Sequence, residues 1–214
     1  ATVVYSGDGT SGLYIWGAQL EAGSFPTTYI PSTVTHTGRA STATFIGSNG
    51  LIQTAASGVA RFNYNPANLS VAPALLLEES RTNLLTYSEQ FDNAAWVKAR
   101  SSVTANAITA PDGTLTADKL VEDTATGVRF IEQVATTVSG TAYTFSAYVK
   151  AGERSRVNLT IYTNTATSVN FDLSAGTILA GSGTITPVGF GWLKVTHTHT
   201  SGLSGVGYFS IYVQ

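Results

Sequence analysis

Short runs in which apolar and polar residues alternate recur along most of the chain. They lie at residues 143–149, 157–161, 169–173 and 192–195, and glycine, asparagine, aspartate or proline separates them. A period of two places successive side chains on opposite faces of a strand, whereas helical periodicity is almost absent. Residues 207–213, Gly-Tyr-Phe-Ser-Ile-Tyr-Val, are nearly continuously apolar and predict a more buried strand. The pattern predicts an all-β protein built as an antiparallel sandwich or barrel.

The same pattern divides the chain into three regions. Residues 1–31 are strand-like, and residues 80–214 carry the regular sandwich pattern. Residues 32–79 hold short strands around Ser48-Asn49-Gly50, a sequence typical of a hairpin turn. This middle region has too few apolar residues per strand to fold alone. We therefore expect an extended, hairpin-containing arm that packs on a neighbour or on symmetry mates.

Composition narrows the class of protein. Charged residues make up only 11% of the 214 residues and the net charge is −2, so the surface is built from threonine, serine, asparagine and glycine, as in extracellular and virion β-proteins. The absence of a basic cluster argues against a nucleic-acid partner, and no apolar stretch is long enough for membrane insertion. There is no cysteine for disulfide or redox chemistry. There is also no methionine, which suggests that Ala1 is a processed end or a cut within a longer chain.

Several blocks of sequence resemble a domain of tailed-bacteriophage tail-fibre, tail-spike and head-fibre structural proteins. The blocks are residues 75–96 (LLLEESRTNLLTYSEQFDNAAW), 109–120 (TAPDGTLTADKL), 143–154 (YTFSAYVKAGER), Gly191-Trp192, and 14–26 (YIWGAQLEAGSFP). Those domains are similar to jelly-roll carbohydrate-binding modules. The resemblance implies a jelly-roll β-sandwich on the exterior of a virion, and therefore extracellular. It also implies contact with other virion proteins and a homo-oligomer, most often a trimer.

The order of the blocks departs from the family pattern. The Tyr-Ile-Trp-Gly-Ala-Gln-Leu-Glu run follows the Gly-Trp strand in the family, whereas here it comes first, at residues 14–21. Read in a circle, residues 210–214 continue into residues 1–5. We therefore expect residues 1–31 to supply the closing strands of a jelly roll whose body is residues 80–214. The acceptor is either the body of the same chain or a neighbouring body, in another chain or in a preceding repeat, which would be completed by strand addition.

Candidate catalytic residues are few. His36, His197 and His199 are the only histidines, and the last two are spaced to share one face of a strand. They would form half of a metal site or, in the interpretation we prefer, part of an exposed polar face. Glu78 and Glu79 are adjacent and would face opposite sides of a strand, unlike the carboxylates of a glycosidase. No catalytic or phosphate-binding motif is present, and we expect no enzyme.

Carbohydrate binding requires flat aromatic faces with amides or carboxylates beside them. The residues that fit these roles are Tyr162, Asn164, Trp192 and Tyr148, and Tyr162 stands where a strand meets a polar loop. Trp16 and Trp96 are further rings, and Asn158, Asn170 and Asp172 are further polar partners. The alternative is that the tryptophans belong to the core.

The resemblance also implies a metal. Jelly-roll modules similar to this one often hold a structural Ca²⁺ where the first and last strands meet, bound by oxygen ligands. Carried onto this sequence, the ligands would be Glu89, Glu21 and Gln19. The alternative is ordinary solvated side chains.

These observations lead to one preferred hypothesis and two alternatives. The preferred function is a non-enzymatic phage virion protein, a tail fibre, tail spike, head fibre or decoration protein, whose jelly roll attaches to host cell-surface polysaccharide. The first alternative is a purely structural subunit of a head-to-tail filament or capsid lattice assembled by strand donation, because a head-to-tail contact that does not close generates fibres. The second is the binding module of a larger polysaccharide depolymerase.

Overall fold

The structure is a computed structural model that describes residues 39–79 and 81–214. These residues form strands joined by turns and loops, with no helix, and every strand pair is antiparallel. The described residues accordingly include no helix that could span a membrane. The predicted all-β class is confirmed.

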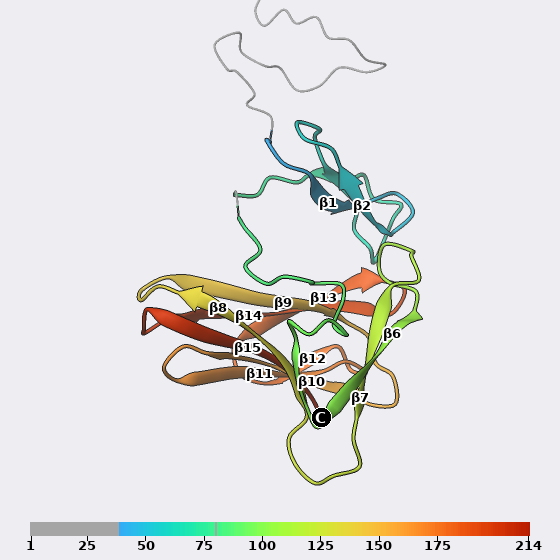
Figure 1. Ribbon diagram of the computed structural model, residues 1–214. Helices are drawn as coiled ribbons and strands as arrows, with labels where there is room; N and C mark the ends of the chain where they lie inside the picture. The colour runs from blue at the N-terminus through green and yellow to red at the C-terminus, as the bar shows by residue number, and fades with distance from the viewer. Residues whose placement is uncertain (1–38, 80) are drawn as a thin grey trace, which may run out of the picture.

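Two sheets dominate the body of the protein (Figure 1). The larger is six-stranded, in the order β12 (Thr177–Ala180), β11 (Ala166–Asp172), β10 (Arg156–Tyr162), β15 (Gly205–Val213), β8 (Phe130–Thr137) and β5 (Val97–Ala99). The smaller is three-stranded, in the order β13 (Gly183–Gly189), β14 (Trp192–Thr200) and β9 (Ala142–Val149). A separate hairpin of β6 (Ser101–Ile108) and β7 (Ala117–Glu122) lies at one end of the two layers.

The runs of alternating residues in the sequence are the strands of these sheets. Residues 143–149 lie in β9, 157–161 in β10, 192–195 in β14 and 207–213 in β15, while the run at 169–173 extends one residue past the end of β11. β15 occupies the middle of the larger sheet between β10 and β8, which agrees with its more continuous apolar sequence.

A single apolar core lies between the two sheets. In β10 the inward residues Leu159 and Ile161 have no exposed surface, and they pack in one cluster with Phe145 of β9 and Phe209 of β15. The rings of Phe145 and Phe209 meet edge to face with centroids 5.8 Å apart, which joins the two layers directly. The body is therefore a β-sandwich in its architecture.

The arm at residues 39–79 contains the expected hairpin. β1 (Ala43–Ile46) and β2 (Ile52–Ala55) pair around the turn at residues 47–51, where Gly50 has a φ of 77°. β3 (Phe62–Asn63) and β4 (Ala74–Leu75) form a second short pair. Buried Arg61 connects the parts of the arm, because its guanidinium donates to the Thr44 carbonyl and pairs with the Glu78 carboxylate at 2.7 Å.

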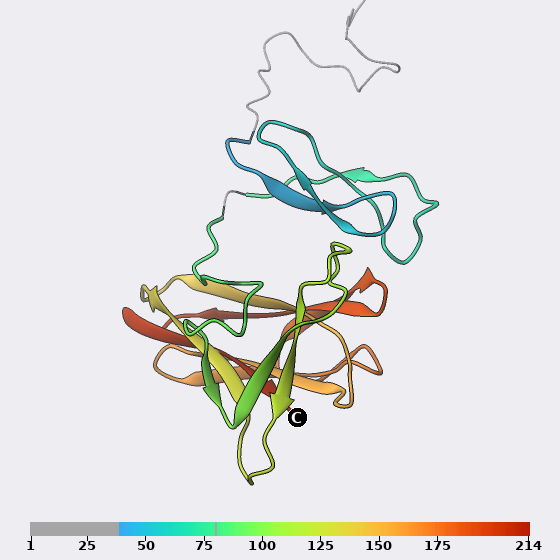
Figure 2. The ribbon, with the colours of Figure 1, turned by 45° about the vertical axis from the view of Figure 1, so that its right-hand side comes forward.

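The arm contacts the body at the tip of the β6–β7 hairpin, which reaches towards it in Figure 2. There the Ile52 amide donates to the Pro111 carbonyl at 3.0 Å. Residues 1–31, predicted to close a jelly roll, lie outside the described residues.

Candidate functional site

The outward side chains of the larger sheet form three rows across β10, β15 and β8. Strand register fixes the rows, because each residue lies directly opposite the next. The first row holds Tyr162, Tyr208 and Val134, the second Thr160, Ser210 and Glu132, and the third Asn158, Tyr212 and Phe130. A polar row therefore runs between two rows rich in aromatic rings, which lie about 13 Å apart along the strands.

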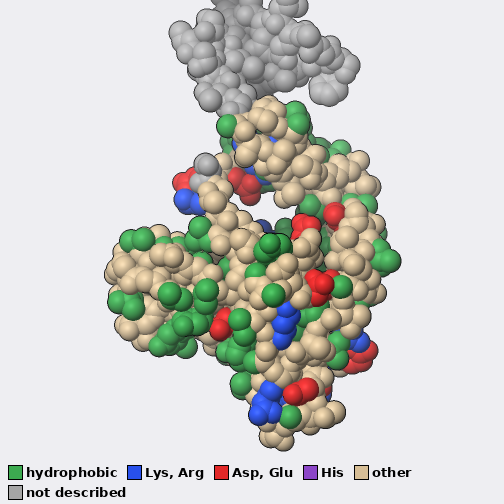
Figure 3. Space-filling view, in the orientation of Figure 1, with side chains coloured by type: hydrophobic (Ala, Val, Ile, Leu, Met, Phe, Trp, Pro, Cys, Tyr) green, Lys and Arg blue, Asp and Glu red, His purple; other side chains and the backbone are tan. Residues whose placement is uncertain are grey.

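These rows enclose an open hollow of about 350 Å³ on the sheet, here called the tyrosine groove. Its lining residues are Glu132, Thr160, Tyr162, Ala166, Tyr208, Ser210 and Tyr212. Serine and threonine are shorter than tyrosine, so the central row forms a floor and the tyrosines form walls. We count Asn158, which lies next to the central row on β10 and is not itself a lining residue, with the floor because it is hydrogen-bonded to Thr160. Hydrophobic side chains gather over the end of the sandwich where β8, β11 and β15 lie (Figure 3).

The walls consist of paired rings. Tyr162 and Tyr208 are 45% and 39% exposed, and their ring centroids are 5.9 Å apart in an edge-on arrangement. Tyr212 and Phe130 are half-buried, with centroids 5.0 Å apart and planes tilted by 42°. Pairs of this kind hold each ring against its neighbour, and Tyr162, Tyr208 and Tyr212 line the groove whereas Phe130 does not.

The floor is hydrogen-bonded within itself. Asn158 donates to Asn170 of β11 at 2.6 Å and accepts from the Thr160 hydroxyl at 2.7 Å. The Ser210 hydroxyl donates to Glu132 Oε2 at 2.5 Å. Asn158 and Ser210 are only 6% and 2% exposed although they face outward, so the floor is largely shielded by the walls. The network therefore holds in place the half-buried Thr160 and Glu132, which are the floor groups that a hydroxylated ligand would meet.

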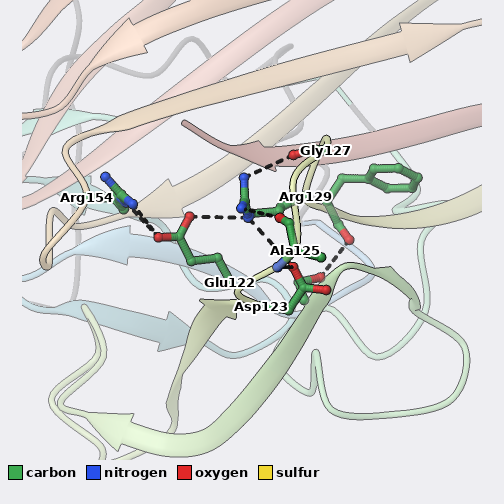
Figure 4. A network of polar contacts seen from close by, with 8 residues as sticks. Glu122, Asp123, Ala125, Gly127, Arg129 and Arg154 are labelled. Carbon is green, nitrogen blue, oxygen red and sulfur yellow. Dashed lines mark hydrogen bonds and ion pairs between the residues drawn. The ribbon is translucent and has the colours of Figure 1, made fainter.

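An ion-pair network holds the loop that leads into β8, the strand that carries Glu132 (Figure 4). Arg129 donates to the carbonyls of Ala125 at 2.7 Å and Gly127 at 3.0 Å, and its Nε lies 3.4 Å from Glu122. Arg154 also donates to Glu122, and this hydrogen bond is the main reason why the pKa of the Glu122 carboxyl is lowered. We interpret these contacts as structural.

The residues predicted to bind carbohydrate divide between the two sheets. Tyr162 lies in the tyrosine groove, and the predicted partners Asn158 and Asn170 share its face of the sheet. Asn164 is exposed in the turn between β10 and β11, with a φ of 137°, just beyond the groove. Asp172 is engaged by the Ser174 hydroxyl and amide.

Tyr148 and Trp192 belong to the smaller sheet and do not join Tyr162. Trp192 is 7% exposed, and its indole donates to the Thr109 carbonyl at 3.2 Å, so little of its ring is available to stack on a sugar, as expected if this tryptophan belongs to the core. Tyr148 is 42% exposed and lies opposite Lys194, with its pKa raised by partial burial and by the Glu78 charge. Trp96 is a core residue at 2% exposure, and Trp16 lies outside the described residues.

The two strand histidines face inward, which corrects the preferred interpretation of an exposed polar face. His197 is 5% exposed and its Nε2 lies 3.0 Å from the Thr167 hydroxyl. His199 makes the equivalent contact with Thr163 at 3.1 Å. Burial lowers the pKa of His197, so the neutral ring is favoured. Their period-two spacing does place them on one face, but that face is covered by the other sheet.

The expected calcium ligands are only partly described. Glu89 is exposed in the segment before β5, whereas Gln19 and Glu21 lie outside the described residues. Within residues 39–79 and 81–214, no group of three or more histidine or acidic side chains is arranged to hold a metal ion. The calcium site stays a prediction.

The sequence interpretation missed Tyr208, Tyr212 and Glu132. The first two come from the run at 207–213, in which tyrosine, serine and tyrosine occupy every second position. That alternation is visible in the sequence, but their proximity to Tyr162 and Glu132 depends on the pairing of β15 with β10 and β8.

No protein-family model matches the chain, and no curated protein matches it at a significant level. We therefore describe the protein by its fold and its groove. It is an all-β, sandwich-like protein whose larger sheet carries a groove with aromatic walls and a polar floor.

Proposed function

We propose that this protein is a non-enzymatic structural component of a phage virion, a tail fibre, spike or head fibre, that attaches to host-surface polysaccharide through the tyrosine groove. The observation that carries this proposal is the arrangement of the groove itself. Partly exposed tyrosine rings suit the apolar faces of sugar rings, and the hydroxyls and the carboxylate between them suit the sugar hydroxyl groups.

We further infer a jelly-roll topology for the sandwich. Successive strands pass between the layers, from β8 to β9, back to β10, and from β14 to β15. This alternation of sheets is the reason for the inference, together with the sequence blocks that resemble phage fibre domains. Assembly as a trimer, in contact with other virion proteins, would multiply weak single-site binding into useful avidity.

Glycan-array binding with matched tyrosine variants tests the attachment function. Tyr162→Ala and Tyr208→Ala each remove a groove wall, whereas Tyr148→Ala removes a ring of similar exposure from the other sheet. We expect the groove variants to lose about tenfold in affinity, about 1.4 kcal/mol, and the control to bind normally. Absence of any glycan binding, or an equal loss in the Tyr148 variant, contradicts the proposal.

The free edge of β9 favours a second candidate function, which is assembly by strand donation. This eight-residue strand lies at the edge of its sheet, and β14 is its only partner among the described strands. Its inward side contributes Phe145 to the core, and no backbone hydrogen bond from another described residue reaches its free edge. A long uncovered edge is a site for strand addition, and we propose residues 10–21 of this or a neighbouring chain as the added strand.

Light scattering behind a sizing column tests strand donation over a wide range of protein concentration. Donation between chains predicts open-ended species that disappear when residues 1–31 are deleted or when a peptide of residues 10–21 is added in excess. A discrete mass of one or three chains that ignores the peptide excludes open-ended donation.

A further inference from the structure

The charge of the tyrosine groove carries an inference about the kind of glycan that it binds. Among the seven lining residues, Glu132 is the only one with a formal charge, and no lysine or arginine is among them. A groove that contains one carboxylate between aromatic walls is complementary to a cation rather than to an acidic sugar.

The carboxylate of Glu132 is held in place but is not neutralised. Ser210 donates to Oε2, whereas no hydrogen bond from a described residue reaches Oε1, and Glu132 forms no salt bridge with a described residue. Its side chain is half-buried, which strengthens a charge interaction relative to one in bulk water.

The cations nearest to the groove along its strands lie beside acidic residues other than Glu132. Arg156, which precedes the groove on β10, lies opposite Asp172 in the strand register and forms no ion pair with a described residue. The pKa of the Asp172 carboxyl is lowered mainly by its hydrogen bond from Ser174, and the Arg156 charge contributes to lowering it. Arg129, at the start of β8, pairs with Glu122 and Asp123. Among the described residues, neither of these cations pairs with Glu132, which leaves its carboxylate for a cationic ligand.

The walls favour the same ligand. Tyr162, Tyr208 and Tyr212 surround the hollow, and the faces of aromatic rings attract ammonium groups. Partly exposed tyrosine rings and a carboxylate oxygen that accepts no hydrogen bond from a described residue are the two components of an ammonium-binding site.

We propose that the tyrosine groove selects glycans that carry a positively charged amino group, with Glu132 as the residue that confers the selection. This inference rests on the proposed attachment function and specifies its substrate class. The ammonium lies against the tyrosine rings and donates to Glu132 Oε1, while the sugar ring occupies the remainder of the groove.

Three oligosaccharides with one backbone and different C2 substituents test the proposal. They are β-1,4-linked hexamers of glucosamine, N-acetylglucosamine and glucose, which present an ammonium, an acetamide and a hydroxyl group. Titration calorimetry with the full chain would be performed in one buffer, acidic enough to keep the amines protonated. We expect the glucosamine hexamer to bind about tenfold more tightly than the other two.

Glu132→Gln is the decisive variant. Glutamine retains an acceptor for Ser210, so the floor is preserved and only the charge is lost, which a thermal melt would verify. Glu79→Gln is the matched control, because it removes the same charge from a side chain that is 78% exposed and outside the groove. The preference for the cationic hexamer should disappear in Glu132→Gln and persist in Glu79→Gln.

The outcomes separate the two proposals. Equal affinity for all three hexamers, lost on Tyr208→Ala, overturns the selection for amino groups and leaves glycan attachment intact. A preference that survives in Glu132→Gln, or that disappears equally in Glu79→Gln, also overturns the selection, because the attraction would then come from overall charge. Failure of these hexamers and of a full glycan array to bind overturns the attachment function itself.

Discussion

The outer faces of the two sheets are both strand surfaces on which every second residue points away from the core, yet they present different chemistry. The larger sheet exposes tyrosines around a polar floor, whereas the smaller sheet exposes mainly threonine. On the smaller sheet the hydroxyls of Thr144 and Thr198 are 2.8 Å apart, and those of Thr184 and Thr196 are 2.6 Å apart. Side chains of equal length pair with one another, whereas long rows on both sides of a short row leave a hollow.

Two tyrosines show that exposure alone does not identify a binding residue. Tyr208 and Tyr148 are 39% and 42% exposed. Tyr208 has Tyr162 opposite it and a polar row beside it, whereas Tyr148 has Lys194 opposite, with the ammonium 5.9 Å from the ring centroid. Tyr148 therefore has a lysine beside its ring, whereas Tyr208 has a second aromatic ring beside it and forms part of an aromatic wall.

The largest expected effect comes from the core that both faces share. Leu159 has no exposed surface and lies on β10 between the floor residues Asn158 and Thr160, pointing the opposite way. Leu159→Ala should lower the free energy of unfolding by about 2–5 kcal/mol, because it leaves a cavity. Urea denaturation would measure the loss. Leu77→Ala, at a site 78% exposed, is the control and should change stability by less than about 0.5 kcal/mol.

A smaller loss is expected from the polar floor of the tyrosine groove. Asn158→Ala removes the partner of both Asn170 and Thr160 at a position that is 6% exposed. Leaving shielded polar groups without partners should cost about 1–3 kcal/mol, which lowers the melting temperature by several degrees. Calorimetric melting checks this. An unchanged melting temperature would mean that water replaces the amide and that the floor is not preorganised.

Sequence reasoning identified the strands because their period-two alternation is a local property. It also singled out Tyr162, which stands at the junction of a strand and a turn and which lines the groove. It did not find Glu132, because β8 and β15 are separated by some seventy residues and only their pairing places Glu132 opposite Ser210. For the same reason the facing direction of His197 could not be known, since alternation shows which residues share a face but not which face is buried.

The histidine buried between the two sheets makes the stability of the protein depend on pH. His197 lies on the inward side of β14, and burial lowers its pKa below the ordinary value of 6.5. The unfolded chain therefore binds a proton more readily than the folded one, so stability is complete above pH 6.5 and falls as the pH is lowered through that value. Urea denaturation from pH 8 to pH 5 should show this fall, and His197→Gln should reduce its slope. If the free energy of unfolding of the variant falls with pH as steeply as that of the original protein, groups other than His197 cause the fall.

The smallest expected effect concerns the threonine pairs and sharpens the comparison with the floor of the groove. Thr184 and Thr196 form a hydroxyl pair as short as the Asn158–Asn170 bond, but on a more exposed surface. Each hydroxyl can bond to water when its partner is lost, so Thr184→Val should change stability by less than about 0.5 kcal/mol. A double-mutant cycle with Thr196→Val would measure the coupling between them, which we expect to be close to zero. A coupling near 1 kcal/mol would show that the threonine face, like the groove, is a preorganised surface.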